Sequence, residues 1–75
     1  MSKYNGHKNW NHWNVSLWIN NDEGLYNTAR GFVRRYCRDE AARYMLEDLQ
    51  SMGMDETPDG APYSMSSIKA AMVGM

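Results

Sequence analysis

Residues 10–24 read WNHWNVSLWINNDEG and hold all three tryptophans of the 75-residue chain. The pattern of this stretch is compatible with either a strand or a helix, and the fold class depends on which of the two it forms. Apolar and polar side chains alternate from Trp13 to Ile19, interrupted only by Trp18, which is typical of a strand. The same residues placed on a helix form two apolar faces, one of which carries Trp10, Trp13 and Leu17.

The rest of the chain favours the helix. No second stretch has the pattern of a strand, and a lone strand would leave its backbone hydrogen-bonding groups unpaired. A strand exchanged between two copies of the chain keeps the alternative open. A helix that is apolar on two sides is expected to lie between other helices. We therefore expect Trp13 and Trp18 to be packed in the core and Trp10, which precedes the periodic region, to be partly exposed.

Two more helices follow from the apolar periodicity. Residues 22–37 are expected to form one, capped by Asn21 or Asp22, with Gly24 and Gly31 either weakening it or allowing a close approach of another backbone. Residues 39–52 are expected to form the next, capped by Asp39 and closed by Gly53. Its apolar face is expected to comprise Ala41, Ala42, Met45, Leu46, Leu49 and Met52.

The C-terminal part contains both prolines and an Asp59-Gly60 pair, which predict a loop over residues 54–63. Ser64 or Ser66 can cap a short last helix that points Met65, Ile68, Ala71 and Met72 inward. The predicted fold is all-α, a small bundle of three to four short helices, and a homodimer is compatible with so small a core. As a single domain, residues 1–75 divide into a flexible arm (1–9), three helices (10–53), a loop (54–63) and a C-terminal helix (64–75).

Composition excludes several classes of protein. Cys37 is the only cysteine, so no disulfide framework or Cys/His zinc site is expected, and a reducing cytosolic compartment is indicated. The polar N-terminus predicts no signal peptide, and no apolar run is long enough to predict a membrane span. The spacing of His7, His12 and Cys37 implies no nucleophile–base pair. We expect no enzyme activity, no cofactor and no bound metal.

Charge is distributed unevenly along a chain whose net charge is −1. Five arginines lie between Arg30 and Arg43, and Arg30, Arg34 and Arg38 share the helix face opposite the apolar one. From Glu47 to Asp59 every charge is acidic. Either region can be a solvated surface, but guanidinium groups also match carboxylates and phosphates. The predicted partner-binding residues are Arg30, Arg34, Arg35, Arg38, Trp10, Asp55, Glu56 and Asp59.

The N-terminal third contains a specific string, Trp13-Asn14-Val15-x-Leu17-Trp18-x-x-Asn21-Asp22, preceded by Tyr4-Asn5-Gly6 and Asn9. It resembles a family of small, largely uncharacterised proteins of tailed phages and other mobile elements. Those proteins often open with a YNG turn and carry the motif N-x-x-T-W-N-V-x-L-W-x-x-N-D. Here His12 replaces the threonine that would cap the helix, so Asn11 is expected to take over the cap.

The resemblance implies a setting rather than a reaction, namely an accessory protein in the cytoplasm of a bacterial host. Small proteins in that setting often block host defence by stoichiometric binding. The leading hypothesis is therefore a non-enzymatic inhibitor, such as an anti-CRISPR protein, that binds a host defence protein or nucleoprotein complex and no membrane. The alternative is a small DNA-binding regulator that uses the arginine-rich helix face, although a net charge of −1 argues against a dedicated nucleic-acid binder.

Overall fold

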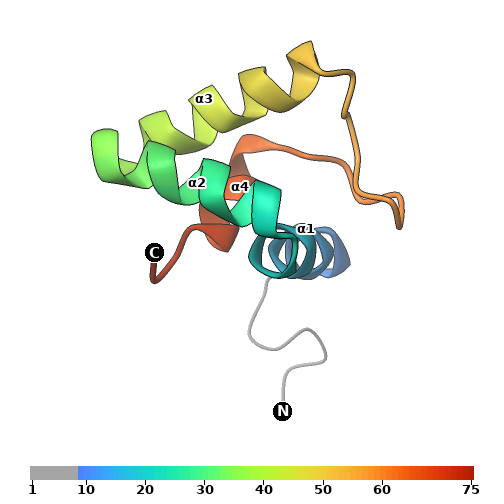
Figure 1. The fold of residues 1–75 in the computed structure, drawn as a ribbon. Coiled ribbons are helices and arrows are strands. Elements are labelled where there is room, and N and C mark those ends of the chain that lie inside the picture. Colours follow the sequence, from blue (N-terminus) through green and yellow to red (C-terminus); the bar gives the residue numbers. More distant parts are fainter. Residues whose placement is uncertain (1–8) are drawn as a thin grey trace.

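The computed structural model describes residues 9–75, and within them the chain forms four α-helices (Figure 1). They are α1 (Trp10–Asn21), α2 (Glu23–Arg35), α3 (Arg38–Ser51) and α4 (Met65–Ala71). The prediction of a small all-α bundle is confirmed, and residues 13–19 are helical rather than extended. The expected N-terminal arm, with Tyr4-Asn5-Gly6, lies largely outside the described residues.

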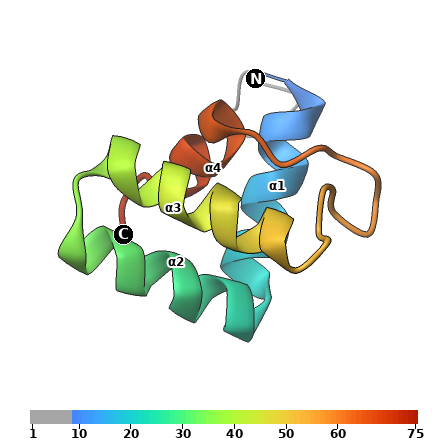
Figure 2. The same ribbon diagram turned by 90° about the horizontal axis from the view of Figure 1, so that it is seen from above.

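The first two helices meet at a single residue. Asp22 donates its backbone N–H to the Trp18 carbonyl at 2.9 Å, which ends α1, and its Oδ1 accepts the Leu25 N–H at 3.0 Å, which begins α2. Because one residue serves both helix ends, the chain turns a sharp corner, and α1 runs across the direction of α2 (Figure 2). The predicted Asp22 cap is confirmed.

Two predicted helix starts are wrong. α1 is capped by Asn9, whose Oδ1 accepts the His12 N–H at 3.0 Å, rather than by Asn11, because the helix already begins at Trp10. α3 begins at Arg38 after Cys37, which makes no side-chain capping hydrogen bond. Asp39 lies instead in the first turn of α3, where it forms an ion pair with Lys69 of α4.

The predicted end of α3 at Gly53 and the predicted Ser64 cap of α4 are confirmed. Gly53 follows the C-cap of α3 with φ of 75°, a left-handed conformation that costs glycine little. Ser64 caps α4 in a reciprocal capping box with Ser67. Gly31, by contrast, allows no close backbone approach, since a Cβ built there meets nothing within 4 Å.

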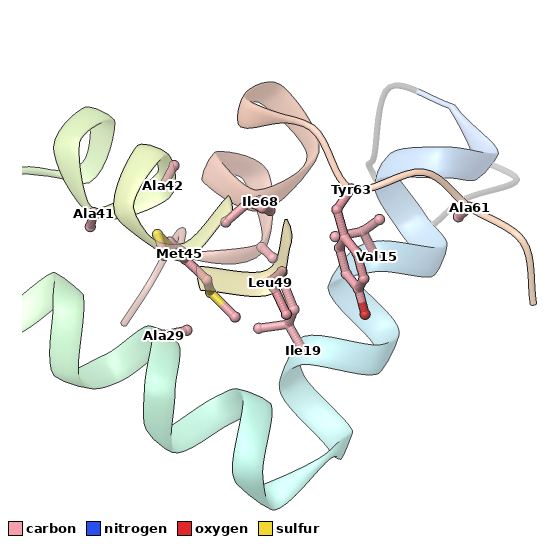
Figure 3. Packing of buried hydrophobic residues seen from close by; sticks show 12 residues of the cluster. Val15, Ile19, Ala29, Ala41, Ala42, Met45, Leu49, Ala61, Tyr63 and Ile68 are labelled. Atoms are coloured by element: carbon pink, nitrogen blue, oxygen red, sulfur yellow. The ribbon is translucent and has the colours of Figure 1, made fainter. Parts of the chain in front are cut away.

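The core lies where α1, α3 and α4 meet over α2 (Figure 3). It contains Val15, Ile19, Ala29, Ala41, Ala42, Met45, Leu49, Ala61, Tyr63, Ile68, Ala71 and Met72. Trp13 and Trp18 are only half-buried, so their predicted place in the core is wrong. So short a chain covers only one side of α1, and apolar residues on its other side stay partly exposed. Two methionines expected inside also point outward, since Met52 is 57 % and Met65 39 % exposed.

The predicted loop between α3 and α4 is ordered around a tight turn. Gly60 N–H donates to the Thr57 carbonyl at 2.8 Å, and Gly60 has φ of 95°. The two arms of the loop are held together by Thr57 N–H to the Ala61 carbonyl and Tyr63 N–H to the Asp55 carbonyl. Thr57, Ala61 and Tyr63 are buried, so the loop closes the core on the side of α1.

Candidate functional site

The two charged regions of the sequence lie at opposite ends of the α2–α3 pair. α3 runs back alongside α2, so Arg34, Arg35 and Arg38 surround the turn that joins the two helices (Figures 1 and 2). Asp22 and Glu23 stand at the other end, where the loop after α3 also begins. The 13 residues of α2 separate the two groups by about 20 Å. The molecule is therefore dipolar.

The arginine pole consists of Arg30, Arg34, Arg35 and Arg38, all of them exposed. The predicted single stripe is wrong in one respect, because α2 ends at Arg35 and Arg38 belongs to α3. Within residues 9–75 none of the four forms an ion pair, and Arg30 donates only a long hydrogen bond of 3.4 Å to the Tyr26 hydroxyl. These guanidinium groups are therefore open to a partner of opposite charge.

The other predicted contact residues do not join the arginine pole. Trp10, the first residue of α1, is 37 % exposed, in agreement with its expected partial exposure. It lies near the start of α4, where the His12 ring hydrogen-bonds Ser66 at 2.8 Å. Asp55 and Glu56 are exposed in the loop after α3. The predicted partner-binding residues thus lie in three separate regions of the structure.

Asp59 makes intramolecular contacts of its own. Its Oδ2 accepts hydrogen bonds from Asn14 Nδ2 and from Trp18 Nε1, both at 2.9 Å. These two bonds, that from Asn14 first, lower the pKa of the Asp59 carboxyl below its ordinary value because they favour the charged form. Asp59 therefore fastens the loop to α1, although it remains exposed on the outside.

A cavity that the sequence did not predict lies at the corner between α1 and α2. Its volume is about 340 Å³, and its lining comes from α1, α2, the end of α3 and the loop. We call it the corner cavity. The described residues that line it are Trp18, Asp22, Gly24, Leu25, Thr28, Met52, Met54, Pro58 and Tyr63. The signals that could have indicated it are Trp18, which breaks the alternation of α1, and the methionines on either side of Gly53.

Polar groups of the corner cavity are few and unusual. Tyr63 is only 7 % exposed, and its hydroxyl has no hydrogen-bond partner within residues 9–75. That oxygen points toward the C-terminal half of α1 (Figure 3). Burial, and secondly the negative charge of Asp22, raise the pKa of the Tyr63 hydroxyl above its ordinary value. Tyr63 and Asp22 thus both belong to the lining of the corner cavity.

Comparison with known proteins gives a family but no function. A family model described as "Family of unknown function (DUF7249)" matches residues 1–75. The chain belongs to this family. The match covers the whole chain, whereas the resemblance noted above covers only its N-terminal third. No curated protein and no solved structure matches.

Three further observations concern metal binding, membrane spans and the free thiol in this chain. In the part of the chain that the structure describes, no three His, Cys, Asp or Glu side chains gather where they could hold a metal ion. None of α1 to α4 is long and apolar enough to cross a membrane. Cys37 has a free, exposed thiol at the turn between α2 and α3. The corner cavity and the arginine pole therefore remain the two candidate sites.

Proposed function

We propose that the protein acts by stoichiometric binding of a partner protein, without chemistry of its own, and that the corner cavity is the centre of the binding surface. The observation that carries this proposal is the combination of a cavity with exposed apolar residues around it. Met52 on its lining is 57 % exposed, and Leu17, which with Trp18 and Asn21 lines a second hollow, is 39 % exposed. Apolar surface of this kind, rimmed by polar residues, marks sites of protein interaction.

We take as the rim of the corner cavity the residues that neighbour its lining residues in the chain, and three of these are acidic. Glu23, Asp55 and Asp59 each follow a lining residue directly in the chain, and Asp22 lines the cavity itself. No lysine or arginine is among the described lining residues. Complementary charge guides association and selects partners, so this rim favours a partner with a basic surface.

The most specific form of the proposal is inhibition of a host defence complex, such as a CRISPR effector, in a bacterial cytoplasm. It is supported by the resemblance of the N-terminal motif to phage and mobile-element proteins. An acidic surface also suits this role, because it can occupy the basic surface with which a defence protein binds nucleic acid.

The test is co-purification of host proteins with the tagged full-length chain, followed by reconstitution from purified components. The variant Met52→Lys changes an exposed cavity residue, and Val73→Lys is the matched control because Val73 is 64 % exposed beyond α4. We expect Val73→Lys and the unaltered chain to bind the same protein at fixed stoichiometry and Met52→Lys to lose it. Undiminished binding by Met52→Lys would place the interface elsewhere.

The host-defence form needs its own readout. Phage plating is compared on defended hosts that express the unaltered chain or the Met52→Lys variant. We expect the unaltered chain to restore plating and the variant to fail. If the unaltered chain does not change plating and no CRISPR or restriction component is recovered, inhibition of host defence is rejected. The broader proposal of partner binding is then tested by the reconstitution alone.

A second candidate function, DNA binding by the arginine pole, is favoured by one observation. Four exposed arginines near the turn between α2 and α3 have no ion-pair partner within residues 9–75. Phosphate contacts release counterions, so log affinity for duplex DNA should fall with log salt by about 0.9 for each phosphate neutralised. A steep slope that the double variant Arg34→Ser/Arg35→Ser flattens supports this function. No binding at low salt rejects it.

A further inference from the structure

We propose that the corner cavity is a subsite for one arginine side chain of the partner protein. This inference rests on the proposed function and deepens it by naming the chemistry that the cavity recognises. A volume of about 340 Å³ lies near the lower end of the range for ligand sites, about 300–1,000 Å³. The cavity is thus of a size for one long side chain rather than for a large cofactor.

The walls of the corner cavity suit the aliphatic and planar parts of arginine. Trp18 is held by the bond from its Nε1 to Asp59, so the position of its ring is fixed before a partner arrives. A second hollow, lined by Leu17, Trp18 and Asn21, also borders the Trp18 side chain. An indole bordered by two hollows offers a face for guanidinium stacking, and Leu25 and Met54 can cover the methylene groups.

The polar end of the corner cavity selects a cation. The Asp22 cap uses Oδ1 to accept the Leu25 N–H, which leaves the other carboxylate oxygen for a second donor. A guanidinium group carries five donors and no acceptor, so it can donate to that free Asp22 oxygen.

Other occupants satisfy the corner cavity less well. An anionic group would be repelled by Asp22 and by the acidic residues of the rim. A purely apolar side chain would fill the walls but take water from the free Asp22 oxygen without giving it a donor, which is costly. A second copy of the chain could insert an arginine of its own arginine pole. The experiment below distinguishes this self-association from the binding of a partner.

The experiment is a titration of the isotope-labelled full-length chain, followed by NMR, with two short peptides. One is acetyl-Gly-Leu-Arg-Leu-Gly-amide, and in the other citrulline replaces arginine, which keeps the shape and removes the charge. We expect the arginine peptide to shift the signals of the Trp18 indole N–H and of the Thr28 and Met54 amides, with a dissociation constant on the order of 1 mM. The citrulline peptide should bind about tenfold more weakly.

Three outcomes of the titration overturn the inference. Equal binding of both peptides would mean that the corner cavity takes an apolar side chain. Broadening of the cavity signals that rises with protein concentration, before any peptide is added, would mean that a second copy occupies it. Absence of cavity shifts with either peptide also contradicts the inference. If Met52→Lys nevertheless abolishes partner binding, the proposed function stands and only the arginine subsite fails.

Two variants test whether the Asp22 charge, rather than the shape of the corner cavity, selects arginine. Asp22→Asn keeps a good helix cap but removes the charge, so the tenfold preference for arginine over citrulline should disappear. Glu23→Gln removes the neighbouring charge outside the lining and should leave most of that preference. Retention of the full preference by Asp22→Asn would refute the assigned chemistry.

Discussion

Asn14 Nδ2 donates to Asp59 Oδ2 at 2.9 Å, which joins α1 to a loop residue 45 positions later. Asn14 is 1 % exposed, and its Oδ1 accepts the Thr57 hydroxyl at 2.6 Å. Thr57 Oγ1 in turn accepts the Ala61 N–H at 3.0 Å. The Asn14 amide therefore fixes both sides of the loop turn, and with it Pro58, which forms one wall of the corner cavity.

Asn14→Ala should destabilise the fold by about 2 kcal/mol. It removes two side-chain hydrogen bonds and leaves the buried Thr57 hydroxyl without its acceptor, and an unsatisfied buried group costs about 1–3 kcal/mol. Asn11→Ala, an exposed position on the same helix, is the control and should change stability by less than about 0.5 kcal/mol. Urea denaturation of the three proteins measures the difference. Equal losses in the free energy of unfolding for the two variants would show that the Asn14 hydrogen bonds do not stabilise the fold.

The Asp59 carboxylate makes part of the stability depend on pH. Hydrogen bonds from Asn14 and then Trp18 lower its pKa in the folded state, so the folded chain binds a proton less readily than the unfolded chain. This stabilisation is present above the ordinary aspartate pKa of about 3.9 and is lost as the pH falls through the folded-state value.

Asp59→Asn should therefore remove part of the loss of stability on acidification, as measured by urea midpoints between about pH 6 and 3. Asp55→Asn is the control because Asp55 makes no side-chain hydrogen bond to the described part of the chain. If Asp59→Asn shows the same acid dependence as the unaltered chain, the Asp59 bonds contribute nothing to stability.

Gly31→Ala should stabilise the fold by about 1 kcal/mol, the difference between glycine and alanine within a helix. Gly31 lies inside α2, is exposed, and has open space where the Cβ would stand. In a domain of this size such a gain raises Tm by about 4–8 °C. Gly53→Ala is the opposite control, because the φ of 75° at Gly53 disfavours any other residue. A fall in Tm for Gly31→Ala would reveal a constraint on α2 that the fold does not show.

Local patterns in the sequence predict most helices but not their packing. Asp22, Gly53 and Ser64 act through neighbours in the chain, so their roles could be predicted from short windows. Apolar residues surround α1, and nothing local says which side the other helices cover. Core burial of Trp18 was accordingly predicted wrongly. The corner cavity was missed for the same reason, since Leu25 and Tyr63 meet there only after the chain has folded.

Tyr63→Phe should leave the fold as stable or stabilise it by about 1 kcal/mol, because it removes a buried hydroxyl that has no partner in residues 9–75. Tyr36→Phe, which removes a hydroxyl from an exposed residue, is the control and should change stability by less than about 0.5 kcal/mol. Thermal and urea denaturation measure both. A clear loss of stability would instead mean that the Tyr63 hydroxyl has a structural partner.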